Sequence, residues 1–368
     1  MADNPLITLG RLGQSPWYDY ITRELIASGR LARLIAGDGL RGMTSNPTIF
    51  QKAVAGSSSY DEDIRALAAA GRSPAEIFEA LSVADVRAAC DAYRPLYDAT
   101  GGADGLVSLE VSPEVAHDTA ASLAMARRLW ALVDRPNAMI KIPGTKAGLP
   151  AITEALAAGI NINITLLFSV DRYREVIAAF QDGLERRVAK ALPVDRIASV
   201  ASFFVSRVDA RVDPLLEKTG DPKRLRGTIA IANAGLAYEV FERSLETPRW
   251  KALAAKGARP QRPLWASTST KDPRYPDTYY IEALVASRTV NTMPPETFDA
   301  YRDHGKPEIR IGRAIAEAPA RIAALEESGI SLAGVTKFLE DDGVAKFAAS
   351  YEQLLAGIEA KLTALAAR

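Results

Sequence analysis

The sequence has few of the residues that bind metals or form disulfides. Its 368 residues include one cysteine, Cys90, and two histidines, His117 and His304. A single cysteine cannot form a disulfide within the chain, and two distant histidines do not provide the closely spaced ligands of a zinc site. We therefore expect neither a disulfide scaffold nor a bound metal. We also expect a reducing, cytoplasmic location.

A net charge, a long apolar run and a cofactor fingerprint are also missing. Lysine plus arginine equals aspartate plus glutamate at 45 each, so no excess charge attracts nucleic acid or a membrane surface. No apolar run is long enough to cross a bilayer, and no basic-then-apolar leader opens the chain. Glycine-rich dinucleotide and phosphate-loop patterns are absent. We expect no cofactor, and any phosphate must be bound by local groups.

Strand-like and helix-like segments alternate along the chain. This alternation predicts parallel β-α units, and eight strands are what a closed barrel needs. We therefore predict an α/β protein in which residues 1–368 form a single (β/α)8 TIM barrel with loop elaborations at 246–263 and 271–278. The strands are expected at residues 16–21, 40–46, 105–111, 138–143, 161–168, 197–204, 264–269 and 280–286.

The last part of the chain, residues 307–368, is expected to be a helical extension packed on the barrel. Its final segment has apolar residues at helical spacing, including Phe347, Tyr351 and Ile358. That apolar face would serve equally well between two copies of the chain. Monomer and homodimer therefore both stay open.

Three neighbouring strands carry polar side chains on one face and aliphatic side chains on the other. The period-two rule places Ser108 and Glu110 on one face of the third strand, and Lys141 lies within the fourth. In the fifth, Asn161, Asn163 and Thr165 face one way, with Ile160, Ile162, Ile164 and Leu166 opposite. Edge strands with a solvated face are the alternative explanation. The helical segments between the strands favour a sheet covered by helices, and hence polar groups inside a barrel.

Catalytic groups in such barrels lie at the carboxyl ends of the strands. A barrel filled only for packing would contain branched aliphatic residues there. The polar candidates at these positions, together with one aromatic neighbour, are Asp19, Thr44, Asn46, Glu110, Lys141, Asn163, Thr165, Ser202, Phe204, Arg207 and Ser267.

A lysine inside a barrel can act as a nucleophile. Burial disfavours its charged form, and the neutral amine attacks a ketone to form a Schiff base. Breaking the adjacent carbon–carbon bond then requires groups that handle protons. Glu110 could do so through a water held by Thr165, and Asp19 could deprotonate the substrate hydroxyl. Asn46 and Asn163 could bind sugar hydroxyls, while Arg207 and Ser202 suit a phosphate.

Several segments together resemble the transaldolase family. They are Met43-Thr-Ser-Asn-Pro-Thr48, Ser108-Leu-Glu-Val111, Ile140-Lys-Ile-Pro143, Asn161-Ile-Asn-Ile-Thr-Leu-Leu-Phe-Ser169 and Ser202-Phe-Phe-Val-Ser-Arg207. Chain length and Trp265-Ala-Ser-Thr-Ser-Thr-Lys-Asp272 resemble the longer bacterial branch. The resemblance implies a class I, Schiff-base enzyme that transfers a dihydroxyacetone unit between phosphorylated sugars of the pentose phosphate pathway.

The resemblance also implies roles for individual residues. Lys141 matches the Schiff-base lysine, Glu110 and Thr165 the pair that activates water, and Asp19 the acid/base aspartate. Asn46 and Asn163 match the amides that bind hydroxyls, and Ser202 and Arg207 match the phosphate site. Thr44 shares a strand face with Asn46, and Phe204 shares one with Ser202, so both are expected to contact the substrate. The family's second phosphate-binding arginine has no clear counterpart here, so Ser267 or Lys271 is expected to serve.

Three other functions are also compatible with parts of this sequence pattern. A fructose 6-phosphate aldolase-like enzyme shares the lysine but releases free dihydroxyacetone. In that group a glutamine and a tyrosine resemble the positions held here by Glu110 and Phe204. A transaldolase fused to a sugar-phosphate isomerase would need a longer chain. A non-catalytic barrel that only binds or scaffolds would not need Lys141, Glu110 and Asp19 together.

Overall fold

A computed structural model describes residues 4–221 and 223–366 of the chain. Its centre is a closed barrel of eight parallel strands in chain order, which confirms the predicted TIM barrel. The strands are β1 (Gln14–Asp19), β2 (Gly42–Thr44), β3 (Leu106–Glu110), β4 (Ala138–Pro143), β5 (Ile162–Leu167), β6 (Ser199–Phe204), β7 (Arg262–Ala266) and β8 (Thr289–Met293).

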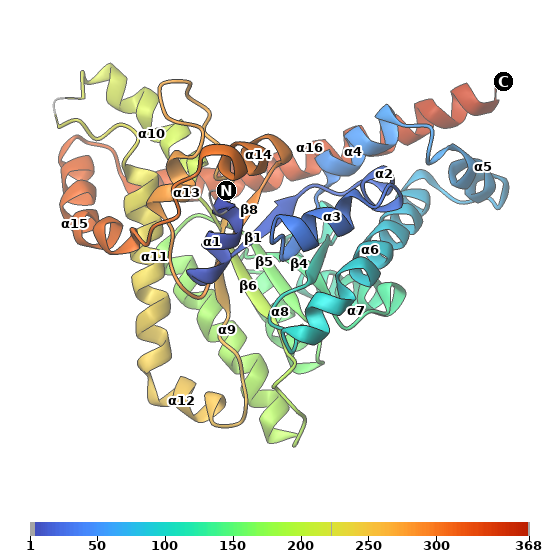
Figure 1. Cartoon of the computed structure of the whole chain (residues 1–368), viewed down its shortest axis with the longest axis horizontal. Coiled ribbons are helices and arrows are strands. Elements are labelled where there is room, and N and C mark those ends of the chain that lie inside the picture. Colours follow the sequence, from blue (N-terminus) through green and yellow to red (C-terminus); the bar gives the residue numbers. More distant parts are fainter. Residues whose placement is uncertain (1–3, 222, 367–368) are drawn as a thin grey trace.

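Helices surround the barrel and cover its outer face (Figure 1). They are α1 (Pro5–Arg11), α2 (Arg23–Ala27), α3 (Arg30–Gly37), α4 (Pro47–Gly56), α5 (Asp61–Ala69), α6 (Pro74–Ala99), η1 (Pro113–Val115, a 3-10 turn), α7 (Thr119–Val133), α8 (Gly148–Ala157), α9 (Val170–Ala189), α10 (Ser206–Lys218), α11 (Ile229–Glu246), α12 (Pro248–Ala254), α13 (Tyr279–Ala283), α14 (Pro295–His304), α15 (Ile311–Glu327) and α16 (Leu332–Ala366). Within the described ranges, no helix is both long enough and apolar enough to span a membrane.

The predicted eighth strand was wrong. Residues 280–286 lie in α13 and the turn that follows it, and the true β8 begins at Thr289. The apolar residues Tyr280, Ile281, Leu284 and Val285 are all buried and recur at the spacing of a helix, so their hydrophobicity alone was misleading. The sequence Thr-Val-Asn-Thr-Met of β8 is short and polar, and its barrel neighbours determine its conformation.

The lower half of the barrel interior is filled by large apolar side chains, as expected for this architecture. Trp17 of β1 is fully buried there, together with Leu106, Met139 and Leu264. Gly42 in β2 leaves room for the indole, because a Cβ atom at this position would lie 2.4 Å from the Trp17 ring. This packing closes the amino-terminal half of the barrel and leaves the carboxyl ends of the strands for a site.

The terminal helix α16 lies across the outer end of the barrel, alongside α4 (Figure 1). It also contacts α5, α6, α10, η1 and β5. The last two residues of the predicted extension, 367–368, lie outside the described residues. Gly343 permits a close approach to β5, since a Cβ atom there would lie 3.2 Å from Leu166 Cδ2. The extension therefore forms part of the wall above the strand ends.

Candidate active site

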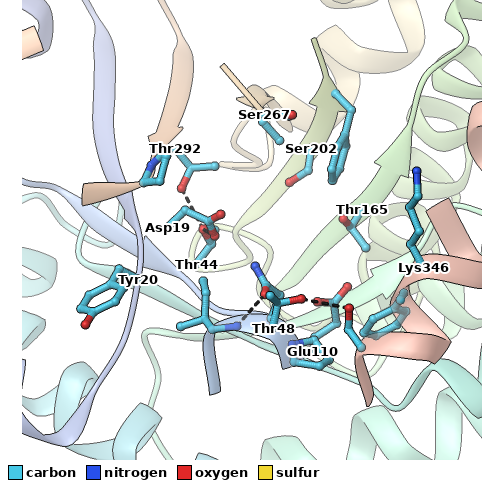
Figure 2. A pocket seen from close by; sticks show the side chains of 18 of the residues that line it. Asp19, Tyr20, Thr44, Thr48, Glu110, Thr165, Ser202, Ser267, Thr292 and Lys346 are labelled. Atoms are coloured by element: carbon cyan, nitrogen blue, oxygen red, sulfur yellow. Dashed lines mark hydrogen bonds between the residues drawn. The ribbon is translucent and has the colours of Figure 1, made fainter. Parts of the chain in front are cut away.

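A cavity of about 490 Å³ opens at the carboxyl ends of the strands. All but one of the twelve residues predicted for the site line this cavity; the exception is Asn163. Figure 2 shows several of these side chains converging on one space from different strands. The predicted residues that line it are Asp19, Thr44, Asn46, Glu110, Lys141, Thr165, Ser202, Phe204, Arg207, Ser267 and Lys271.

Lys141 and Glu110 form an ion pair at the wall of the cavity. They are direct neighbours in the register of β3 and β4, so both side chains point into the barrel. The Lys141 Nζ donates to Glu110 Oε2 at 3.2 Å, and the two side chains are only 9% and 7% exposed. Burial raises the pKa of Glu110, and the charge of Lys141 opposes that rise only in part. A primary amine and a carboxyl of raised pKa thus share one buried space.

Asp19 is held by a short chain of hydroxyls at the ends of β1, β2 and β8. Thr44 Oγ1 donates to Asp19 Oδ1 at 2.6 Å and lies 2.8 Å from Thr292 Oγ1 (Figure 2). Burial raises the pKa of Asp19, while Lys141 and the hydrogen bond from Thr44 lower it. Asp19 is therefore fixed in position, and its pKa stays above the ordinary value, which suits a group that exchanges protons with the substrate.

The end of β5 departs from regular strand geometry. The pairing of β5 with β6 shifts register between Ile164 and Leu167, and Leu166 has a φ of 60°. This bulge turns Leu166 into the cavity beside Thr165, so the predicted placement of Leu166 on the opposite face was wrong. The Thr165 hydroxyl is buried and has no hydrogen-bond partner among the described residues. It is available to a water or a substrate in the cavity.

The two predicted amides differ in their surroundings. Asn163 is fully buried; its side chain donates to Ser108 Oγ at 3.0 Å and accepts from Ser202 Oγ at 2.7 Å. It therefore orients Ser202, which does line the cavity. Asn46 lines the cavity and also caps α4, because its Oδ1 accepts from the backbone N–H of Ile49 at 3.0 Å. That cap leaves the amide N–H groups of Asn46 to donate.

Cations and hydroxyls gather at the ends of β6 and β7. The Arg207 guanidinium lies 5.1 Å from the centroid of the Phe204 ring. Burial lowers the pKa of Arg207, and Asp342, Asp19 and Glu110 oppose this. Ser267 Oγ is 3.1 Å from Ser206 Oγ, and Lys271 Nζ donates to Ser269 Oγ at 3.0 Å. This side of the cavity suits an anion with several oxygens.

Further lining residues were not predicted from the sequence. The tail helix contributes Gly343, Lys346, Phe347 and Ser350, and β8 contributes Thr292. Ser350 Oγ accepts from Thr48 Oγ1 of α4 at 3.0 Å, which links the two helices over the strand ends. The helical spacing of apolar residues in the C-terminal segment predicted a helix, but no local sequence pattern indicates that this helix reaches the site. Within the described ranges, no group of three or more His, Cys, Asp or Glu side chains could hold a metal ion.

Comparisons with known proteins agree with this geometry. The family model for transaldolase/fructose-6-phosphate aldolase matches residues 16–358. The chain is 53% identical to a transaldolase of Parafrankia sp. (strain EAN1pec) over 361 residues, which cover 97% of this chain and 98% of that protein. It is also 53% identical to a transaldolase of Acidothermus cellulolyticus over 363 residues, which cover 98% and 97%. The chain therefore belongs to the transaldolase/fructose-6-phosphate aldolase family.

Proposed function

We propose that this protein is a transaldolase. It takes a dihydroxyacetone unit from a ketose phosphate, sedoheptulose 7-phosphate or fructose 6-phosphate, and gives it to an aldose phosphate, glyceraldehyde 3-phosphate or erythrose 4-phosphate. The observation that carries this proposal is the buried Lys141 amine, 3.2 Å from Glu110 in a cavity that also holds Arg207. Membership of the family and the printed names of the relatives support the same activity.

The first half of the reaction forms a Schiff base. Lys141 first passes a proton to Glu110, 3.2 Å away, and the neutral amine then attacks the C2 carbonyl of the ketose to give a carbinolamine. Loss of its hydroxyl as water needs a proton donor, and formation of the imine needs a base. Glu110 fills both roles through a water that the unpartnered Thr165 hydroxyl can hold. The raised pKa of Glu110 suits a group that both gives and accepts protons.

Carbon–carbon cleavage uses the second carboxyl. Asp19 takes the proton of the C4 hydroxyl, the C3–C4 bond breaks, and the electron pair moves into the imine to give an enamine. The first aldose phosphate leaves, and the same carbon attacks a second aldose phosphate while Asp19 returns the proton. Water then hydrolyses the new imine by the reverse of the first half, which releases the product ketose phosphate and frees Lys141. The hydroxyls of Thr44 and Thr292 hold Asp19 in place both when it removes the proton and when it returns it.

The remaining residues bind the substrate. Asn46 donates to sugar hydroxyls, and Asn163 contributes by orienting the Ser202 hydroxyl. Arg207 binds the phosphate together with Ser202. Ser267 and Lys271, on the neighbouring strand end, supply the further contacts for which no second arginine is available.

The alternative is a fructose 6-phosphate aldolase that releases free dihydroxyacetone. One observation favours transfer: Phe204, at the cavity wall, packs against Phe168 with ring centroids 5.2 Å apart and presents no proton donor. A shielded enamine survives until a second aldose arrives. In the aldolase group, a tyrosine resembles this position.

The test is borohydride trapping with fructose 6-phosphate, followed by peptide mapping. We expect an irreversible adduct on Lys141, and loss of both adduct and turnover in Lys141→Met. Lys146→Met is the matched control, because Lys146 is exposed just beyond the same strand and should keep the adduct and the turnover. An adduct on another lysine, or near-normal turnover in Lys141→Met, would exclude the proposed mechanism.

A further inference from the structure

The tail helix α16 is fixed above the cavity by contacts on both sides. Glu340 accepts from Arg172 Nε at 3.5 Å, and the Phe338 ring lies 4.1 Å from the Arg211 guanidinium. Further along, Ser350 accepts from Thr48, and Gly343 lies against β5. These contacts flank the turn of α16 that carries Lys346 and Phe347. The placement of this turn over the strand ends is therefore a property of the fold.

Lys346 lines the cavity from this helix, on the same side of the close-up view as Thr165 (Figure 2). Its Nζ donates to Asp342 Oδ2, one turn earlier, at 2.7 Å, while its side chain is 66% exposed. The charge of Asp342 also opposes the lowering of the Arg207 pKa by burial. One carboxylate therefore interacts electrostatically with two cations that line the same cavity.

This arrangement suits a cation that exchanges partners. The Lys346 and Asp342 side chains are 66% and 25% exposed, so solvent screens this ion pair and a more highly charged anion can displace Asp342. A phosphate group carries more charge and more acceptor oxygens than Asp342, and a lysine on a flexible stem can follow it. Arg207 brings a phosphate to this side of the cavity in the proposed reaction.

We propose that Lys346 is a substrate-binding residue that exchanges Asp342 for the phosphate of the sugar, so that the tail helix completes the phosphate site. This inference rests on the proposed function and adds a residue from α16 to those of β6 and β7. Asp342 then acts as the resting counter-charge of Lys346 and Arg207, and is the group with which the phosphate competes.

The first experiment compares Lys346→Met with Lys337→Met. Both lysines lie on α16 and pair with an aspartate four residues away, but Lys337 is 65% exposed and bonded to Asp341 away from the cavity. For Lys346→Met we expect KM for erythrose 4-phosphate to rise about 5–20-fold, with kcat changing much less. KM for unphosphorylated erythrose should not change. Lys337→Met should match the wild type with both acceptors.

The second experiment uses inorganic phosphate alone as the probe, and follows its binding by calorimetry. Affinity should fall in Lys346→Met and rise about 2–5-fold in Asp342→Asn, because a competitor has been removed. The gain should shrink when both substitutions are combined, leaving only the part that acts through Arg207. Far-ultraviolet circular dichroism and the melting temperature establish that each variant folds.

The outcomes separate this inference from the proposed function. Equal losses for erythrose 4-phosphate and erythrose in Lys346→Met would overturn it and make Lys346 part of the cavity wall only. Unchanged phosphate binding in both Lys346→Met and Asp342→Asn would also overturn it. If the wild type transfers no dihydroxyacetone and traps no imine, the proposed function fails, while the calorimetry still decides whether Lys346 binds phosphate.

Discussion

Both ends of the barrel bury carboxyl groups, but the two ends treat them in opposite ways. At the closed end, Asp104 accepts from Ser15 Oγ at 2.7 Å, from Arg41 at 2.9 Å and from Arg262 at 3.1 Å. Burial alone would raise the pKa of Asp104, yet these partners hold it below its ordinary value. At the open end, the pKa of Glu110 and of Asp19 stays raised, because Lys141 opposes their burial only in part.

Burial does not decide the charge state of a carboxyl by itself. Two guanidiniums and a hydroxyl are enough to keep an aspartate ionised when it is almost fully buried. At the open end, Lys141 is shared between Glu110 and Asp19, and it does not offset their burial even with the charge of Arg207 added. The closed end is therefore built for stability, and the open end keeps groups that can exchange protons, as expected for opposite faces of a TIM barrel.

The largest effect should follow from changing the open end. Glu110→Gln keeps the shape of the side chain but removes its proton exchange, so turnover should fall by about 10²–10⁴-fold. The melting temperature should change little. The measurement is kcat for fructose 6-phosphate with erythrose 4-phosphate. An unchanged kcat would mean that Asp19 alone transfers protons. The proposal that Glu110 exchanges protons at the open end would then be wrong.

The pH dependence of kcat/KM in the wild type should reveal the raised pKa of Glu110. A carboxyl acting as a base is lost when it is protonated, so kcat/KM should fall as the pH falls through the raised pKa of Glu110. The acid limb should therefore lie above 4.5, the ordinary value for glutamate. Glu110→Gln should remove this limb and leave the one from Asp19. A limb at or below 4.5 in the wild type would contradict the raised pKa.

A smaller effect, on stability and not on rate, should follow at the closed end. Asp104→Asn leaves Arg41 and Arg262 without their shared carboxylate and should cost about 2–4 kcal/mol of unfolding free energy. Since the folded pKa is lowered, this contribution is present above pH 3.8 and is lost as the pH falls through the lowered value. Urea unfolding at two pH values measures it.

Two controls accompany the stability measurement on Asp104→Asn. Asp98→Asn removes an exposed partner of Arg94 on α6 and should cost at most about 0.5 kcal/mol. The kcat of folded Asp104→Asn should match the wild type, because Asp104 lies at the opposite end of the barrel from Lys141. A loss of kcat with unchanged stability would mean that the two ends are coupled, and the proposed division of roles would be wrong.

Sequence patterns predicted seven of the strands and the barrel because each strand carries its own alternation or apolar run. They failed at β8, whose short polar sequence depends on pairing with β1 and β7. They also failed at Leu166, because a bulge of one residue reverses the face of a side chain without a sequence signal. Lys346 was missed for a related reason: its position in the site comes from the packing of α16 and not from local sequence.

The smallest effect should come from one added hydroxyl at the open end. After the first aldose leaves, the enamine on Lys141 must avoid protonation, and the Phe204 ring offers no proton. Phe204→Tyr places a hydroxyl near this carbon, so the ratio of free dihydroxyacetone to sedoheptulose 7-phosphate should rise with erythrose 4-phosphate as acceptor. The expected change is several-fold, since a misplaced donor provides only part of the usual acid catalysis of about 10²–10⁴-fold.

The control concerns Arg207, whose guanidinium lies 5.1 Å from the centroid of the Phe204 ring. KM for erythrose 4-phosphate must therefore be measured alongside the ratio, to separate proton donation from a disturbed phosphate contact. An unchanged ratio with unchanged KM would assign the shielding to Phe347 of the tail helix, which lines the same cavity.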